Sequence, residues 1–323
     1  MALATNSASP HANQADLDVR GLARQLARQL RGEVRFSSGS RALYANDSSV
    51  YRQPPLGVVI PRDAADVVSA VEICRQFGAP LGARGCGTGL AGQTVNEVVL
   101  FDFSKYMNEI VELDHERRFA RVQPGVVLDW LRSAAEKHAL TFGPDPATHS
   151  RCTLGGMIGN NSCGTHSIMA GVTADNIEAL EVVLSDGTWM TLPNSVDEDE
   201  LARMIAAGGR VGQLYERLRD LRDRYAELIR ERYPQIPRRI SGYNLERLLP
   251  EHGFNLAAAV VGSEATCVLV LEARCKLIES PQHRSLVLAG YDDCPTAADQ
   301  VPAVMEFDPI GLETFDRQLV LAT

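Results

Sequence analysis

"TLGGMIGNNSCGTHS", residues 153–167, is the stretch on which the interpretation of this chain depends. It places glycines, two adjacent asparagines and several small hydroxyl-bearing residues between ordinary apolar segments. This composition predicts an irregular segment that is neither helix nor strand. Bare backbone and small polar side chains over such a length indicate that something approaches the chain closely there.

A second glycine-rich stretch, "GARGCGTGLAG", occupies residues 82–92. Its Gly87-x-Gly89-x-x-Gly92 spacing formally matches the dinucleotide-binding pattern, which requires a strand before the turn and a helix after it. The apolar run "VVLFDF" begins six residues after Gly92 and leaves no room for that helix. A Walker loop is excluded because no Lys-Ser/Thr pair follows. The remaining interpretations are a flexible surface loop and a backbone cradle.

Taken together, the two stretches favour a site for a diphosphate-containing cofactor. The chain is acidic and neither stretch is rich in lysine, so backbone N–H groups would hold the anion. Each charge-assisted hydrogen bond is worth about 1.5–3 kcal/mol, so several donors suffice. Arg84 either adds charge at the rim or forms a structural ion pair. Asn160 and Asn161 either bind the polar edge of a heterocycle or form a turn.

Composition limits the functional class. A chain of 323 residues has room for about two domains, and 45% hydrophobic residues indicate a globular core. The net charge of −9 argues against nucleic acid as a partner. No apolar run approaches the ~18 residues of a membrane span, and the first residues lack a signal peptide's basic and apolar regions. These features predict a cytoplasmic protein.

The seven cysteines support the same compartment. None forms a C-x-x-C pair, so no zinc or iron–sulfur site is expected within the chain. An odd number of cysteines without a secretion signal is typical of reduced thiols.

Helices and strands alternate without an internal repeat. Pro61 and Asp63 open a helix that ends at Gly78, and an Asp-Gly pair predicts a hairpin over residues 180–192. Further helices are expected near residues 18–32, 126–138 and 198–232, and strands within 79–85, 98–103, 120–125 and 257–277. The mixture predicts the α+β or α/β class.

Three motifs in order carry a resemblance to a known family: "RGCGTGLAGQ" (84–93), "GPDPATHSRCTLGGMIGNNSCGTHS" (143–167) and "VGSEAT" (261–266). They resemble the flavin-binding motifs of the vanillyl-alcohol-oxidase or p-cresol-methylhydroxylase-type family. The residues of these motifs are most similar to those of its 2-hydroxy-acid dehydrogenase branch, which includes D-lactate, glycolate and D-2-hydroxyglutarate dehydrogenases. "SGYNLERLLP" (241–250) resembles the large bacterial members that join this flavin domain to an iron–sulfur domain.

The resemblance implies an α+β, two-subdomain FAD-binding fold of p-cresol-methylhydroxylase type and a set of cofactor-binding residues. The pyrophosphate would lie on Arg84, Gly85, Cys86, Gly87, Thr88, Gly89 and Leu90. The flavin and its phosphates would be lined by Asp145, Thr148, Ser150, Thr153, Gly155, Gly156, Asn160, Asn161, Ser162, Gly164, Thr165 and His166. Gly262, Glu264 and Thr266 would flank the adenine or ribityl side.

Three positions in these motifs need comment. Ala265 stands where family members usually carry glycine, so this loop is expected to bind less closely. Some members attach the flavin covalently through a histidine in the first glycine loop. Thr88 occupies that place here, so the resemblance implies non-covalent FAD. His166 is either a catalytic base or a hydrogen-bonded structural histidine.

The domain boundaries expected on this basis are an N-terminal tail and helix (1–36), the FAD-binding domain (37–283, with loops 82–92 and 143–167) and the incomplete beginning of a substrate cap domain (284–323). In the resembled family the substrate-gripping groups lie mostly in the cap. No catalytic residue is therefore assigned, and little turnover is expected of this chain alone.

The function implied is an FAD-dependent dehydrogenase that oxidises a small 2-hydroxy acid such as D-lactate, glycolate or D-2-hydroxyglutarate. Its electron acceptor would not be NAD; an iron–sulfur domain or subunit beyond this chain is one candidate. Two alternatives remain: an alcohol or sugar oxidase on the same scaffold, and a non-catalytic flavin-binding subunit.

Overall fold

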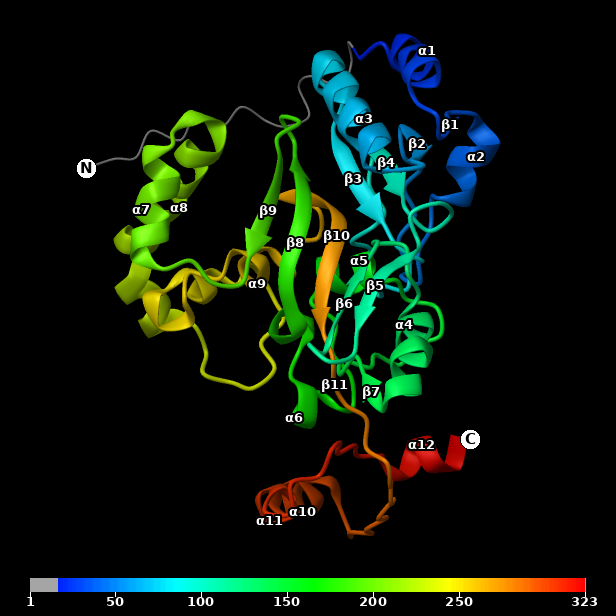
Figure 1. Cartoon of the computed structure of the whole chain (residues 1–323). Helices are drawn as coiled ribbons and strands as arrows, with labels where there is room; N and C mark the ends of the chain where they lie inside the picture. Colours follow the sequence, from blue (N-terminus) through cyan, green and yellow to red (C-terminus); the bar gives the residue numbers. More distant parts are fainter. Residues whose placement is uncertain (1–16, 323) are drawn as a thin grey trace, which may run out of the picture.

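The computed structural model describes residues 17–322 and contains both helices and strands (Figure 1). The α-helices are α1 Val19–Gln29, α2 Ser38–Leu43, α3 Ala64–Phe77, α4 Leu128–Ala135, α5 Leu154–Asn160, α6 Ser167–Ala170, α7 Glu198–Ala206, α8 Gly209–Arg232, α9 Leu256–Val260, α10 Cys294–Asp299, α11 Val301–Met305 and α12 Arg317–Ala322. The strands are β1 Glu33–Arg35, β2 Gly57–Ile60, β3 Leu81–Arg84, β4 Val99–Asp102, β5 Ile110–Asp114, β6 Phe119–Val122, β7 Leu140–Thr141, β8 Ile177–Leu184, β9 Trp189–Pro193, β10 Val268–Lys276 and β11 Ile278–Glu279.

Residues 33–102 build a four-stranded sheet in the order β1-β2-β4-β3. β2, β4 and β3 are parallel, and β1 joins antiparallel at the edge. The connection from β2 passes through α3, which Asp63 caps at its start and Gly78 ends in a left-handed conformation, as the sequence predicts. β2 and β4 are buried along their whole length, which is typical of parallel strands covered on both faces.

A five-stranded antiparallel sheet follows, in the order β5-β6-β10-β8-β9. The predicted hairpin is present as β8 and β9, and Gly187 takes the left-handed conformation in its turn. Each sheet has its own principal core, and Val183, Leu269 and Leu271 of the second sheet pack into the core of the first. The α+β prediction is confirmed, with a separate principal core for each sheet.

Two expectations about local structure are wrong. Residues 154–160 form helix α5, because the Thr153 hydroxyl caps it and Leu154, Met157 and Ile158 are buried at helical spacing. The beginning of the expected strand region 257–277 is helix α9, which Asn255 caps through the Ala258 N–H. Its alanines favour helix, and only Val268–Lys276 forms the strand.

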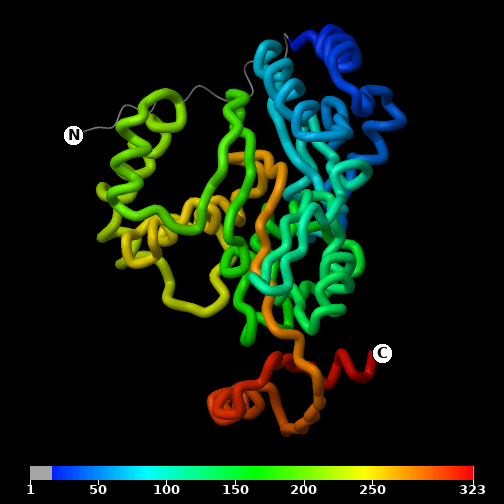
Figure 2. The backbone as a smooth tube through the Cα atoms, viewed as in Figure 1, coloured from blue at the N-terminus to red at the C-terminus, as the bar shows by residue number. Residues whose placement is uncertain are grey.

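The remaining elements lie at the periphery. The helical region 198–232 is two helices, α7 and α8, which break at the left-handed Gly208 and lie beside β9 (Figure 1). Beyond β11 the chain runs through α10, α11 and α12, which lie apart from both sheets (Figure 2). Within residues 17–322, no helix is long and apolar enough to cross a membrane.

Candidate functional site

A cavity of about 460 Å³ opens where the two sheets meet. Its walls come from the loop after β3, from helix α5, from the turn that follows α9 and from the first residues of β10. Fourteen of the residues expected to bind cofactor line it: Arg84, Gly85, Cys86, Gly87, Thr88, Gly89, Leu90, Thr148, Thr153, Gly155, Gly156, Asn160, Ser162 and Glu264. Segments far apart in sequence thus share one cavity.

The loop after β3 presents unbonded backbone to this cavity. Within residues 17–322, the five N–H groups of residues 86–90 have no hydrogen-bond partner. Gly87 has φ +66°, and a Cβ there would stand 2.3 Å from Nη2 of Arg84. Both the backbone conformation and the lack of space therefore require glycine at this position. The carbonyl of Gly87 faces away and accepts from the N–H and hydroxyl of Ser48. Successive N–H groups in such a loop form a concavity that suits an anion.

Arg84 adds a positive charge beside these N–H groups. It makes no ion pair with any residue between 17 and 322, and its buried Nη1 has no hydrogen-bond partner there. Its guanidinium lies 5.7 Å from the ring centre of Tyr44, whose hydroxyl donates to Asp102 at 2.7 Å. Burial, followed by the bond to Asp102, raises the pKa of Tyr44. Of the two interpretations of Arg84, the geometry favours the cationic rim over the structural ion pair.

Helix α5 contributes shape to the cavity more than hydrogen-bond donors. The Gly155 N–H donates to the carbonyl of Pro124 at 2.8 Å, and the Gly156 N–H donates to the Thr153 hydroxyl at 3.3 Å. Both donors are therefore occupied. A Cβ on Gly155 would stand 2.7 Å from the Pro124 Cβ, and one on Gly156 would stand 3.7 Å from the Gly85 Cα, so the missing side chains let α5 pack closely against its neighbouring loops.

The turn after α9 is held to α5 through the backbone. Gly262 N–H donates to the carbonyl of Ile158 at 2.8 Å, and Glu264 N–H donates to that of Gly159 at 3.0 Å. Glu264 and Ala265 have φ values of +51° and +61°. This conformation explains why glycine would be favoured at position 265, and it places a Cβ where strain is expected.

Eight expected residues do not line the cavity: Asp145, Ser150, Asn161, Gly164, Thr165, His166, Gly262 and Thr266. Asp145 accepts from the His166 backbone N–H at 3.0 Å, and its other oxygen lies 2.8 Å from His166 Nδ1. A Cβ on Gly164 would stand 2.0 Å from the Asp145 carbonyl oxygen. These three residues close the loop on itself, which favours the structural interpretation of His166.

Asn161 also has a structural position. It is buried, ends α5 with φ +54°, and its Oδ1 accepts from the Ala174 N–H at 3.0 Å. Thr266 donates to the Ser263 carbonyl and lies 2.9 Å from the hydroxyl of Tyr243. Both residues thus support the walls from behind.

Sequence reasoning missed the apolar side of the cavity, which Phe103, Pro124, Met157, Val268 and Val270 line. The alternation of Val268 and Val270 along β10 was the available signal, since one face of a strand repeats every second residue. Cys152 also lines the cavity, and burial raises its pKa to about 11, which keeps this thiol protonated at neutral pH. A cavity that combines apolar residues with an anion cradle suits a heterocycle joined to phosphate.

Among residues 17–322, the charged residues that line the cavity are Arg84 and Glu264, and no lysine lines it. Burial raises the pKa of Glu264, and the Gln93 side chain opposes part of that rise. Among the described residues, no group of three or more His, Cys, Asp or Glu side chains could hold a metal ion.

Comparison with known proteins agrees with this geometry. Residues 55–193 match the family described as "FAD binding domain". The chain is 34% identical over 299 residues to D-2-hydroxyglutarate dehydrogenase of Pseudomonas putida, covering 90% of this chain and 29% of that protein. It is 31% identical over 300 residues to glycolate oxidase subunit GlcD of Bacillus subtilis, covering 91% and 53%. The chain therefore spans under a third of the first relative's length and about half of the second's.

Solved structures with the same fold include alkyldihydroxyacetonephosphate synthase, with a TM-score of 0.57 and 17% identity over 82% of this chain and 44% of that one. Another is 6-hydroxy-D-nicotine oxidase of Arthrobacter nicotinovorans, with a TM-score of 0.52 and 19% identity over 77% of this chain and 43% of that one. At this identity the likeness concerns the fold alone.

Proposed function

Because the chain carries an FAD binding domain of the vanillyl-alcohol-oxidase and p-cresol-methylhydroxylase family, we propose that it is the flavin-binding part of an FAD-dependent 2-hydroxy-acid dehydrogenase. The proposal rests on the row of five N–H groups at residues 86–90, which have no partner among residues 17–322, beside the guanidinium of Arg84, which has no ion pair there. A diphosphate would provide negatively charged oxygens that accept hydrogen bonds from these donors. The cavity's apolar wall then receives an aromatic part of the same cofactor.

The residues present fit FAD on three counts. Within residues 17–322, Arg84 has a buried donor without a partner, the N–H groups of residues 86–90 have no partner, and apolar residues such as Phe103 and Val268 line the same cavity. Bound flavin supplies a two-electron acceptor for hydride from the substrate's α-carbon. The chain's own contribution is to bind the diphosphate, orient the ring system against apolar residues and keep water from that face.

All of the residues named as cofactor-binding remain proposals, with two kinds of role. Those that line the cavity would contact FAD. Asp145, Asn161, Gly164 and His166 would instead hold the contacting segments in place. The small-molecule 2-hydroxy acid, its oxidation to the 2-oxo acid and an electron acceptor beyond this chain are proposed from the relatives. The unpaired state of all seven cysteines supports a cytoplasmic location.

The first experiment identifies the cofactor. The purified chain should be yellow, and mass analysis of the released chromophore should find FAD. A diphosphate cradle joined to a second, apolar wall is longer than a mononucleotide requires. Release of FMN alone, or of a nicotinamide nucleotide, would contradict the assignment.

The second experiment addresses the substrate class. Because little turnover is expected of this chain alone, the experiment uses a longer chain with a complete cap domain, loaded with FAD. Rapid mixing with D-2-hydroxyglutarate, glycolate or D-lactate should bleach its flavin absorbance, and simple alcohols or sugars should not. Bleaching by an alcohol or sugar but not by the acids would favour an oxidase on this scaffold. A flavin that none of these compounds reduces would favour a non-catalytic binding subunit.

A further inference from the structure

The far end of the cradle loop has few backbone attachments. Near its start, Gly85 packs against α5, and the Gly87 carbonyl is held by Ser48. Towards its end, Leu90 is 78% exposed and no backbone–backbone bond within residues 17–322 ties residues 88–91 to α5. The N–H groups of residues 86–90 should bind one anion more tightly if their positions are fixed beforehand, since ordering a loop on binding costs affinity.

The Gln93 side chain is placed to fix that end. Its Oε1 accepts from the Ala91 N–H at 3.3 Å, and a Cβ on Gly89 would stand 2.8 Å from the same oxygen. The amide therefore folds back under the loop that carries the free N–H groups. Its Nε2 donates to Asn160 Oδ1 at 3.4 Å, at the end of α5.

The same amide also reaches the third segment of the site. The carboxylate of Glu264 is stabilised by the Gln93 side chain, which lowers the pKa that burial raises. Glu264 is in turn held to Gly159 through its backbone N–H. The half-buried Gln93 side chain is thus bonded to the cradle loop and to α5, and it also interacts with the Glu264 carboxylate in the turn after α9.

We propose that Gln93 is a positioning residue that latches the free end of the 86–90 cradle onto α5 and the 262–266 turn, and so presets the cradle for a diphosphate. This inference rests on the proposed FAD site. Gln93 acts through the loop: its acceptor holds the loop backbone, and its donors hold the two walls. A carboxylate at position 93 would keep the acceptor but oppose Glu264 with a like charge.

The test compares Gln93→Glu, Gln93→Leu and the double variant Gln93→Glu/Glu264→Gln, with FAD affinity measured by flavin fluorescence quenching. Gln93→Glu should weaken FAD binding about tenfold or more, because hydrogen bonds are lost and like charges meet. In the double variant the new amide at 264 can donate to the carboxylate at 93. This hydrogen bond between positions 264 and 93 should restore FAD affinity to within about threefold of that of the starting protein. Gln93→Leu should also have a lower FAD affinity. Adding Glu264→Gln to it, as a second double variant, should not restore that affinity.

The matched control is Gln76→Glu, the same change on an exposed side chain of α3 whose Oε1 already acts as an acceptor. It should leave FAD affinity unchanged. Thermal melting of each ligand-free variant separates loss of affinity from loss of folding. If Gln93→Glu binds within twofold of the starting protein, or if Glu264→Gln fails to rescue it, the latch is overturned while the FAD site stands.

Amide hydrogen exchange of the ligand-free chain tests the latch without FAD. Exchange over residues 88–92 should be faster in Gln93→Leu and Gln93→Glu than in the starting protein, and slowed again in the double variant. If the starting chain binds no FAD, the proposed function fails, and this exchange decides the latch by itself. Unchanged exchange in both single variants would overturn it.

Discussion

Gly85 lies directly against Thr153: a Cβ on Gly85 would stand 2.5 Å from the Thr153 hydroxyl oxygen and 3.3 Å from the Gly156 Cα. This contact joins the start of the cradle loop to the capping residue of α5, over nearly seventy positions of sequence. It explains why both glycine-rich stretches occur in one chain. Each lacks side chains at the place where the other approaches.

Replacing Gly85 by alanine should therefore separate the two walls. The hydroxyl of Thr153 can rotate away, but the Gly156 backbone cannot, so the loop must shift by a few tenths of an ångström. We expect FAD affinity to fall at least about tenfold, and the free energy of unfolding to fall by about 1–3 kcal/mol from overpacking. Gly39→Ala, in α2 with nothing within 4 Å, should do neither. Equal FAD affinities, by fluorescence titration, would show that the contact does not shape the site.

Ala265→Gly should stabilise the chain. Ala265 has φ +61°, a conformation that costs an L-residue roughly 1–2 kcal/mol. Glycine adopts this conformation at little cost, but it loses more conformational entropy on folding than alanine does. A net gain of about 0.5–1 kcal/mol in the free energy of unfolding is expected in urea titration. The matched change Ala259→Gly, inside helix α9, should destabilise by up to about 1 kcal/mol. If Ala265→Gly lowered the free energy of unfolding as Ala259→Gly does, the backbone at Ala265 would not be strained.

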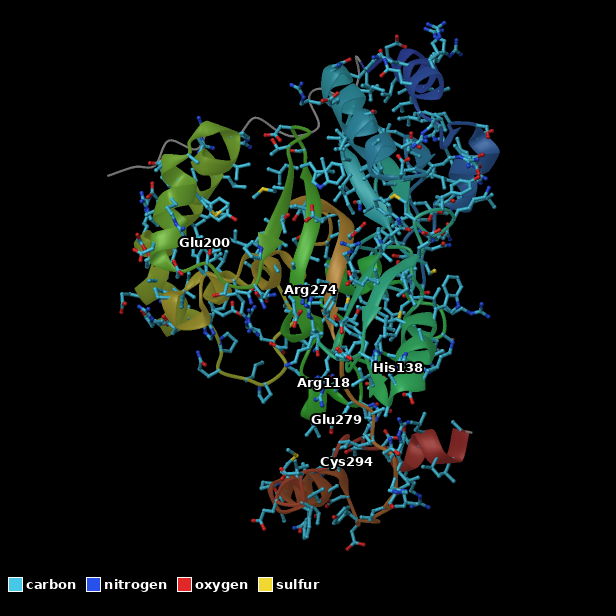
Figure 3. All side chains as sticks on the ribbon, in the orientation of Figure 1. Arg118, His138, Glu200, Arg274, Glu279 and Cys294 are labelled. Atoms are coloured by element: carbon cyan, nitrogen blue, oxygen red, sulfur yellow. The ribbon has the colours of Figure 1, made fainter. Side chains whose placement is uncertain are left out.

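FAD should protect Cys86 from alkylation. Cys86 lines the cavity, whereas Cys294 lies on the C-terminal helical segment, away from both sheets (Figure 3). Desolvation in the cavity raises the pKa of Cys86 above its ordinary value of 9.0, so its alkylation should accelerate as pH rises through 9. Pulse labelling read by mass spectrometry should show a several-fold slower reaction at Cys86 with FAD present, and no change at Cys294. Equal rates at Cys86 with and without FAD would place the cofactor elsewhere.

The flavin should be dissociable. Thr88, on the cradle loop, lacks the nucleophilic ring nitrogen through which histidine attaches flavin in some family members. Acid precipitation should leave the yellow colour in the supernatant and a colourless protein pellet. A pellet that keeps the flavin through denaturation would show a covalent bond that no residue named here explains.

Much of the local structure was predictable because its signals are local. Asp63 and Gly78 mark the ends of α3, and the Asp-Gly pair marks the β8–β9 turn. The predictions for α5 and α9 were wrong for a common reason. They followed the amino-acid composition of each stretch and overlooked the positions of its capping and buried residues. Three glycines and two asparagines obscured the capping hydroxyl of Thr153 and the buried spacing of Leu154 and Met157.

The sequence by itself determined which backbone would be bare: the glycines of 82–92 and 153–167, and the lack of lysine, implied an anion held by N–H groups. Only the tertiary structure decided which of those N–H groups are free. Gly155 and Gly156 donate theirs to Pro124 and Thr153, whereas those of residues 86–90 find no acceptor in the part of the chain that the structure describes. The reason is that a hydrogen bond depends on which partner lies within about 3 Å, and partners distant in sequence are brought there by packing of the two sheets.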